Sequence, residues 1–470
     1  MEKGVLKQMD TQLYFGNHID AYQEDMLRDL ARLIAIPSVC GKPEGKYPYG
    51  KKSAEALELI LSMAQEMGFD TVNADYYAGH AEYGEGEEIA AVLAHVDVVP
   101  TGDGWNSDPF TLTRKGDLLF GRGTADDKGE AIAALYGLKA LKDAGVLGKR
   151  RLRVIFGAGE EVGMEDLPHY FEKEPLPDYA FTPDADYGIC NREKGILRVK
   201  VSGPASPSVQ KFTGGSVVNA VPEHAAITLH CPLDSAKALS ESKLPGDFTF
   251  SVSQQGLEIE SKGVAVHAMQ PDKGFNAISH AVALLGSVLP EEDLGAFLTF
   301  LLQKVGCETD GTSLGIACAD EPSGSLTCNL GLISMDETGA EASFDIRYPV
   351  TADGETIIKA FREAAASFGL AFEVVEQEKP LYLPADSPFI HLLQGSYTAV
   401  TQKPCELYAT GGGTYARAVS GRGVAFGPLF PDEPDRGLHN ANEHIDLNRY
   451  MEHARICLEA MYRMLTQDIQ

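Results

Sequence analysis

One segment constrains the fold of this chain more than any other. Residues 88–99 read EIAAVLAHVDVV, a continuous apolar run rich in valine that lies between Gly86 and Pro100. Such a run is typical of a strand that is buried on both faces of its sheet. The segment therefore favours a sheet that is covered by helices on both sides.

The segments around it alternate between helical and extended patterns. Apolar residues recur at helical spacing in three places, so we expect helices over 21–36, 53–69 and 129–145, with Ser53 as the N-cap of the second. Short apolar runs that end in glycine or polar residues predict strands over 117–123, 151–159 and 178–184. This alternation predicts an α/β fold with a mostly parallel sheet and helices on both of its faces.

The pattern changes in the middle of the chain. From GILRVKVSG (195–203) to SFDIRYPV (343–350), polar and apolar residues alternate over short stretches, which is typical of antiparallel strands. Strands are expected over 225–231, 247–256 and 257–263, and helices over 276–289 and 292–306. After Pro380 the α/β pattern returns, with a helix expected over 389–402 and a strand over 424–428. We therefore expect an α/β domain, residues 1–190 and 381–470, interrupted by an inserted α+β domain, residues 191–380.

The charge of the chain excludes some classes of partner. Its 470 residues include 40 basic and 68 acidic ones, which gives a net charge of −28. An excess of negative charge repels phosphate backbones and anionic lipids, so neither nucleic acid nor a membrane is expected as a partner. Acidic side chains are nevertheless the groups that bind divalent metals, so a cation site is compatible with this composition.

The chain shows no sign of export. No apolar run approaches the roughly 18 residues that cross a bilayer, and residues 1–20 lack the apolar core of a secretory signal. The eight cysteines are scattered and form no CxxC pair. These features predict a cytoplasmic protein with reduced thiols.

Polar residues gather where the predicted strands end. His95 and Asp97 lie two apart near the end of the valine-rich strand, on one face of it, where a mutually satisfied buried pair is the alternative to a functional role. Asp126, in GRGTADDKG, follows the next strand and could instead cap a helix. Asp184, in FTPDAD, ends another strand, and His439, in RGLHNANEH, could be a solvated loop histidine.

The segment GAGEEVG (157–163) needs separate treatment. Its three glycines resemble a dinucleotide-binding loop, but Glu160 and Glu161 would lie where a pyrophosphate binds and would repel it, so we reject that interpretation. In open α/β sheets, ligands bind at the carboxyl ends of the strands. Two histidines and three carboxylates that converge at this edge would form a shell for two divalent ions, which can lower the pKa of a shared water toward about 7.

Five motifs occur in one order that resembles a known family. HVDVVP, GRGTADDKG, GEEVG, FTPDA and GLHNANE are similar to the motifs of the co-catalytic metallopeptidases, which include aminoacylases, glutamate carboxypeptidases, desuccinylases and carnosinase-like dipeptidases. FDIRYP, GGGTYAR and the long insertion most resemble the bacterial peptidase V-type dipeptidases. The resemblance covers nearly the whole chain.

The resemblance implies a role for each of these metal-site residues. His95 and Asp184 would hold one metal ion, Glu161 and His439 the other, and Asp126 would bridge the two. Zn²⁺ is the favoured metal, and the same ligands would accept Mn²⁺ or Co²⁺.

The resemblance also implies roles for residues around the metals. Glu160 would be the general base, Asp97 would orient His95, and the peptide bond between Asp126 and Asp127 would be cis. GAGEEVG departs from the Glu-Glu-Ser or Glu-Glu-Thr ending that is usual in the family.

The inserted domain contributes further candidates through the same resemblance. His267, in KGVAVHAMQPDKGFNA, would stabilise the oxyanion, with an exposed loop histidine as the alternative. Asn219 would contact the substrate, and Arg347 would grip a substrate carboxylate unless it forms a salt bridge on the sheet surface. Gly412 and Gly413 could offer backbone N–H groups to that carboxylate or simply form a tight turn.

These expectations define one main hypothesis. The chain would be a cytoplasmic, monomeric dimetal dipeptidase that cleaves short peptides with a free C-terminal carboxylate, through a metal-bridging water and Glu160, after the inserted domain closes as a lid. An N-acyl-amino-acid deacylase or desuccinylase of the same family is the alternative. A metal-binding or transport-accessory protein without catalysis is a third alternative. Glu160 argues against it, because a site that only binds metal needs no additional acid beside its ligands.

Overall fold

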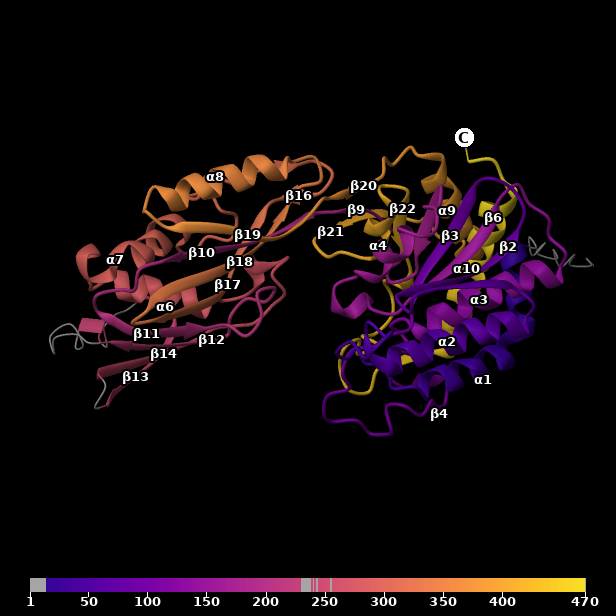
Figure 1. The fold of residues 1–470 in the computed structure, drawn as a ribbon, viewed down its shortest axis with the longest axis horizontal. Coiled ribbons are helices and arrows are strands. Elements are labelled where there is room, and N and C mark those ends of the chain that lie inside the picture. The colour runs from indigo at the N-terminus through magenta and orange to yellow at the C-terminus, as the bar shows by residue number, and fades with distance from the viewer. Residues whose placement is uncertain (1–13, 230–237, 240, 242–243, 254–255, 470) are drawn as a thin grey trace, which may run out of the picture. The chain divides into compact units, whose positions relative to one another are not determined.

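The computed structural model of the chain describes residues 14–229, 238–239, 241, 244–253 and 256–469 (Figure 1). These residues form two compact units. Unit 1 contains the described residues up to Asn191 together with Tyr382–Tyr408 and those from Gly413 onward, and unit 2 contains Arg192–Leu381 and Ala409–Gly412. Each unit has its own large cluster of buried apolar side chains, so each is described by itself below.

Unit 1 is built on a sheet whose central strands are parallel. In sheet order its strands are β1 (Asp70–Ala74), β2 (Ala78–Gly84), β6 (Arg151–Gly157), β3 (Ile89–His95), β7 (Tyr179–Thr182), β22 (Gly423–Phe426), β9 (Ile189–Glu193) and β20 (Leu381–Tyr382), with β21 (Leu407–Thr410) beside β9. β3 pairs in parallel with β6 and β7, and β22 pairs in parallel with β7. Two smaller sheets pair β8 (Ala185–Asp186) with β23 (Pro428–Leu429), and β4 (Thr113–Lys115) and β24 (His444–Asp446) with β5 (Leu118–Phe120).

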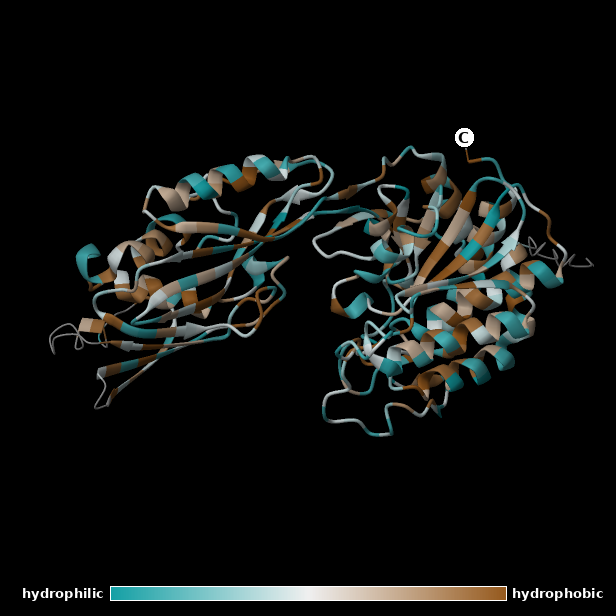
Figure 2. Ribbon diagram, viewed as in Figure 1, coloured by the Kyte–Doolittle hydropathy of each residue, from teal (hydrophilic) through white to brown (hydrophobic). Residues whose placement is uncertain are grey.

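The valine-rich segment forms β3, which is buried along its whole length. Because successive strand residues face opposite sides, Ala90 and Val92 belong to one apolar cluster, and Ala91 and Leu93 to another. The first cluster includes side chains of α1 (Gln23–Ile34), α2 (Gly50–Glu66), α3 (Lys128–Asp143), α9 (Pro388–Thr401) and α10 (Leu447–Thr466). The second includes side chains of α4 (Asp166–Phe171) and of the 3₁₀ helix Tyr415–Val419. Figure 2 shows hydrophobic colour along these central strands. The expected sheet with helices on both faces is confirmed.

The boundaries of one predicted helix were wrong at its start. α2 begins at Gly50 rather than at Ser53, and Tyr49 occupies the N-cap position. Ser53 is instead fully buried, and its hydroxyl donates to the carbonyl of Ala158 at 2.5 Å. A hydroxyl that could have capped the helix therefore supports the loop after β6.

Unit 2 is an antiparallel sheet with helices, as the sequence predicts. In sheet order its strands are β13 (Asp247–Ser253), β14 (Gly256–Lys262), β12 (His224–Leu229), β11 (Val209–Gly214), β17 (Thr327–Asp336), β18 (Gly339–Tyr348), β10 (Gly195–Gly203) and β19 (Ala371–Glu378). β15 (Ala319–Asp320) pairs with β16 (Gly324–Ser325), and the helices are α6 (Ala277–Gly286), α7 (Glu291–Phe300) and α8 (Gly354–Ala366). Residues 230–231 and 254–255 of the predicted strands lie outside the described residues, as do residues 1–13 of the segment searched for a signal.

Among the described helices of either unit, none is both long enough and apolar enough to cross a membrane.

We predict that acid destabilises unit 1 through His453 of α10. His453 is fully buried, and Nδ1 lies 2.9 Å from the Tyr187 hydroxyl, whereas Nε2 has no hydrogen-bond partner among the described residues. Burial, followed by the charge of Arg436, lowers its pKa to about 3. Between its unfolded pKa of about 6.5 and pH 3, only the unfolded chain binds the proton, so stability is full above pH 6.5 and falls below it.

At pH 5 the loss relative to pH 7 is about 2 kcal/mol for this histidine. We would measure the free energy of unfolding in urea at pH 7 and at pH 5. Between these pH values, His453→Gln should lose about 2 kcal/mol less than the wild type. His224→Gln, which changes an exposed histidine, serves as the control. An acid sensitivity of His453→Gln equal to that of the wild type would contradict the prediction.

Candidate metal centre and active site

The three central parallel strands bring the predicted residues to one edge of the sheet. His95 is the last residue of β3, Glu160 and Glu161 follow β6, and Asp184 follows β7. Because β6, β3 and β7 are parallel neighbours, their carboxyl ends meet there. Asp126 reaches the same edge from the loop before α3, as the distances below establish.

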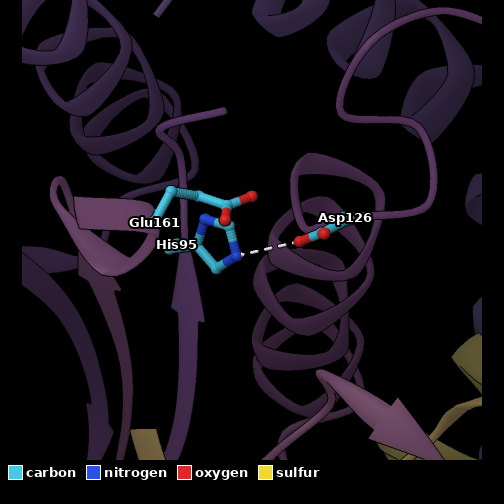
Figure 3. A group of neighbouring side chains, drawn as sticks. All are labelled: His95, Asp126 and Glu161. Carbon is cyan, nitrogen blue, oxygen red and sulfur yellow. Dashed lines mark hydrogen bonds and ion pairs between the residues drawn. The ribbon is translucent and has the colours of Figure 1, made fainter. Parts of the chain in front are cut away.

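Asp126 lies between two histidines. Its Oδ1 is 3.1 Å from His95 Nε2, and its Oδ2 is 3.0 Å from His439 Nε2 (Figure 3 shows the first contact). Glu161 Oε1 lies 3.3 Å from His439 Nε2, and Asp184 Oδ2 lies 3.9 Å from His95 Nε2. One carboxylate with a different imidazole at each oxygen has the arrangement that a ligand shared by two metal ions requires.

Two groups of potential ligand atoms share His95. The first is completed by Asp126 and Glu161, and the second by Glu160 and Asp184, with all ligand atoms of each group within 4.8 Å of one another. The structure thus brings together all five predicted metal ligands and the predicted base. Their roles as ligands and base stay predictions.

The donor set fits divalent metal ions. Imidazole nitrogens and carboxylate oxygens suit zinc, manganese and cobalt. Four carboxylates of this cluster meet two imidazoles, and negative charge in a buried site is costly unless a cation compensates it. Burial, followed by the charge of Asp126, raises the pKa of Asp184 to about 7. Hydrogen bonds to Asp126 and Glu161 raise the pKa of His439 to about 10, because these carboxylates stabilise a positive charge between them.

Asp97 supports both sides of this cluster. Its carboxylate lies 3.4 Å from His95 Nδ1, and its carbonyl oxygen lies 3.1 Å from the same atom. Its two carboxylate oxygens accept the backbone N–H groups of Glu160 and Glu161, each at 3.1 Å. The thiol of Cys40, one of the scattered cysteines, donates to Asp97 at 3.3 Å. Asp97 therefore couples the orientation of His95 to the position of the two glutamates.

The glycines of GAGEEVG are explained by packing. A Cβ atom at Gly157 would collide with the Tyr415 hydroxyl, and one at Gly159 would collide with the Tyr49 ring. Gly163 has a φ of 118°, which side chains rarely adopt. The pattern that resembles a nucleotide loop therefore serves the close approach of two tyrosines and a turn.

Glu443 is a supporting residue that the sequence-based reasoning missed. One oxygen of this buried carboxylate accepts the N–H groups of Gly123 and Ala125, at 3.0 and 2.9 Å, and the other accepts from Arg122 at 2.5 Å. It shapes the loop before Asp126, whose peptide bond to Asp127 is cis, as the resemblance predicts. Its place in the motif GLHNANE, four residues after His439, was the only signal for it.

In unit 2, Asn219 and His267 lie on adjacent segments. Ala220 forms an isolated antiparallel bridge with His267, and the N–H of Ala268 donates to the carbonyl of Asn219 at 2.9 Å. The N–H of Met269 donates to His267 Nδ1 at 3.1 Å. In the neutral imidazole this hydrogen bond leaves the proton on Nε2, which can then donate. Burial, followed by the charge of Arg347, lowers the pKa of His267 and favours this neutral form.

Asn329 is a second residue that the sequence-based reasoning missed. It is buried, and its side-chain amide donates to the carbonyls of Val218 and Ala220, at 3.2 and 2.9 Å. These carbonyls flank Asn219, so Asn329 holds the segment that carries it. Asparagine inside a strand gave no sign of this contact in the sequence, because the two segments are distant along the chain.

Arg347 is only 3% exposed and is engaged within unit 2. Its Nε and Nη2 donate to the two oxygens of Asp345 at 2.6 and 2.8 Å, and its Nη1 donates to the carbonyl of Gly411 at 2.8 Å. The N–H of Gly412 donates to the Thr410 hydroxyl at 3.1 Å. Direct binding of a substrate carboxylate by Arg347 stays a prediction. In the structure, Arg347 instead holds the glycine segment through Gly411.

Gly412 and Gly413 fall on opposite sides of the division between the units, with Gly412 in unit 2 and Gly413 in unit 1.

Comparison with known proteins gives one consistent family. Residues 91–465 match the model of peptidase family M20/M25/M40. The Bacillus subtilis protein named "Putative dipeptidase YtjP" is 36% identical over 461 residues, covering 94% of this chain and 97% of its own. The Staphylococcus haemolyticus protein named "Putative dipeptidase SH1171" is 32% identical over 467 residues, covering 96% and 99%.

Solved structures agree at the level of the fold. Human carnosine dipeptidase 1 superposes with a TM-score of 0.60 at 15% identity, covering 96% of this chain and 98% of its own. Aminoacylhistidine dipeptidase from Vibrio alginolyticus superposes with a TM-score of 0.59 at 13% identity, covering 94% and 97%.

We predict that the purified chain binds two divalent ions and that its ligands divide between them. Equilibrium dialysis against Zn²⁺ or Mn²⁺ should give two ions per chain for the wild type. His439→Ala should keep one ion and lose the second, because it removes a ligand on one side of Asp126 only. Asp126→Ala should weaken both, because each histidine faces one of its oxygens.

His444→Ala, which changes a histidine in the strand after the same loop, is the control and should still bind two ions. Retention of both ions by Asp126→Ala would contradict the bridging assignment.

Proposed function

Because the chain belongs to peptidase family M20/M25/M40, we propose that it is a metal-dependent dipeptidase that hydrolyses dipeptides with a free C-terminal carboxylate, with Glu160 as general base. The chain is a metallopeptidase, and the two relatives described above each carry the name "Putative dipeptidase". One observation carries the assignment of the base. Glu160 lies with His95 and Asp184, their ligand atoms within 4.8 Å of one another, and takes no part in the other group, which is formed by His95, Asp126 and Glu161.

The residues around Glu160 suit a proton-transfer role. Burial, followed by the charge of Asp184, raises the pKa of Glu160, which favours a group that accepts and then releases a proton. Asp97 holds the backbone N–H groups of Glu160 and Glu161 alike. The carboxylate of Glu160 lies near Asp184, whereas that of Glu161 lies near Asp126 and His439, so one can bind a metal ion while the other meets the water.

The reaction divides between the bound ions and this chain's side chains. Two divalent ions held by His95, Asp184, Asp126, Glu161 and His439 would lower the pKa of the attacking water and polarise the peptide carbonyl.

Glu160 accepts a proton from that water as the water oxygen bonds to the carbonyl carbon. It then donates the proton to the amine nitrogen as the carbon–nitrogen bond breaks.

We assign stabilisation of the oxyanion to His267. Its Nδ1 is occupied by the N–H of Met269, so the neutral ring presents Nε2–H as a donor. A neutral donor of this kind stabilises negative charge on the carbonyl oxygen and consumes no proton.

Contact with the rest of the substrate is assigned to Asn219, Arg347, Gly412 and Gly413. The contact of Arg347 with the carbonyl of Gly411 supports a role of this arginine in holding the glycine segment in place. We further propose zinc as the bound metal, with manganese or cobalt as substitutes, and a cytoplasmic monomer as the active form.

Glu160→Gln should keep both metal ions and lose at least about 100-fold in kcat, because it retains the shape but cannot accept the proton. The measurement is hydrolysis of a panel of dipeptides by the chelated enzyme after Zn²⁺, Mn²⁺ or Co²⁺ is added back, with metal content determined in parallel. Glu172→Gln, an exposed glutamate of unit 1, is the matched control and should leave kcat unchanged. Near-normal turnover by Glu160→Gln would contradict the assignment.

The same panel should include N-acetyl and N-succinyl amino acids. Dipeptides should be cleaved with the higher kcat/KM, because the proposal assigns the substrate a peptide bond and a free carboxylate. A preference for the N-acyl compounds would identify a deacylase and contradict the dipeptidase proposal.

His267→Ala should lower kcat by about 100-fold, the loss typical of one oxyanion donor, and should leave both metal ions bound. His224→Ala changes an exposed histidine of the same unit and should have no effect on kcat. Equal kcat values for His267→Ala and the wild type would exclude the oxyanion role.

A further inference from the structure

Four consecutive backbone N–H groups at the proposed base donate to two buried carboxylates. Those of Ala158 and Gly159 donate to Asp166 Oδ2, each at 2.9 Å. Those of Glu160 and Glu161 donate to Asp97, as described above. Hydrogen bonds to a charged acceptor are roughly twice as strong as neutral ones, so two carboxylates hold the whole loop.

Asp166 is itself held on two sides. Its Oδ1 accepts the N–H of Leu167 at 2.9 Å, and its Oδ2 also accepts the hydroxyl of Tyr415. Asp166 and Tyr415 are both 0% exposed, so these contacts are shielded from bulk solvent. The missing side chain of Gly157 leaves the space in which the tyrosine hydroxyl and the carboxylate meet.

We propose that Asp166 and Tyr415 are positioning residues, which hold the backbone of Ala158 and Gly159 and thereby set where the Glu160 carboxylate lies. Neither residue belongs to the predicted ligands or substrate contacts. The consequence for turnover rests on the proposed function. The consequence for metal binding does not, because Glu161 lies on the same loop.

The position of the loop matters more for the chemical step than for substrate binding. A shift of about 1 Å in a reacting group can cost on the order of 100-fold in rate. Glu160 acts on the water rather than on the substrate's binding groups, so a displaced loop should lower kcat and leave KM nearly unchanged. A residue that only stabilises the fold would not lower kcat while leaving KM nearly unchanged.

Two variants test the contact from its two sides. Asp166→Asn keeps the shape of the side chain, but its amide group loses the charge and turns a donor toward backbone N–H groups. Tyr415→Phe removes only the hydroxyl. We expect Asp166→Asn to lower kcat by about 10- to 100-fold, and Tyr415→Phe to lower it by about 10-fold, with KM within twofold of the wild type, since changes behind a ligand shell typically cost that much.

Unit 1 offers a matched control for loss of a buried tyrosine hydroxyl. Tyr136 of α3 donates to Asp29 of α1 at 2.6 Å, and both residues are buried. Tyr136→Phe removes an equivalent hydrogen bond between two helices, so it should leave kcat and metal affinity unchanged.

Calorimetric titration of each metal-free variant with Mn²⁺ supplies a readout that is independent of catalysis. Asp166→Asn should weaken binding of one ion by about 10-fold, because Glu161 shifts with the loop. Unchanged kcat and unchanged Mn²⁺ affinity in both variants would overturn the proposal, as would equal losses in Tyr136→Phe. If the wild type cleaves no dipeptide, the proposed function fails, and the Mn²⁺ titrations still decide whether Asp166 and Tyr415 hold the loop.

Discussion

Buried carboxylates that accept pairs of neighbouring backbone N–H groups are the interaction on which the site depends. Asp97 accepts from Glu160 and Glu161, and Glu443 accepts from Gly123 and Ala125. A buried charge is tolerated only when hydrogen bonds satisfy it, so each of these carboxylates requires its loop to keep one conformation. The loops in turn present Glu160, Glu161 and Asp126 at the edge of the sheet, where side chains of like charge would otherwise separate.

The centre is built from few elements because single residues or segments make several of its contacts. Asp97 contacts both the ring of His95 and the loop of the glutamates, so one side chain serves two strands. Glu443 and His439 come from one short segment, which therefore supplies both a predicted ligand and the support of Asp126. A displacement of either segment would therefore move more than one predicted ligand at the same time.

Unit 2 follows a related principle with neutral groups. The side-chain amide of Asn329 donates to the carbonyls of the residues before and after Asn219. The N–H of Met269 donates to Nδ1 of His267 and so selects its tautomer. Arg347 donates to the carboxylate of Asp345 and to the carbonyl of Gly411, so its charge is balanced inside the unit. Here buried side chains orient loop segments, and the loop segments carry the residues that the family resemblance assigns to substrate.

The sequence by itself determined the layer architecture and the composition of the site. The valine-rich run predicts a strand buried on both faces, and strand-end placement groups His95, Glu161 and Asp184 because parallel strands share one edge. Asp126 follows β5, which belongs to a separate antiparallel sheet, so that rule does not account for its place beside them. Ser53 shows the limit of local patterns, since a serine that could cap a helix instead donates to Ala158, a residue far along the chain.

Only the tertiary structure decided which residues support the site. Cys40 and Asn329 lie in no motif, and Glu443 lies in the motif of His439 without any sign of its contacts with Gly123 and Ala125. The glycines of GAGEEVG resemble a nucleotide loop until the structure shows Tyr49 and Tyr415 packed against them. Their roles arise from hydrogen bonds and close contacts between segments that are distant in sequence. Such contacts leave no periodic pattern along the chain, because they depend on where the folded backbone brings each segment.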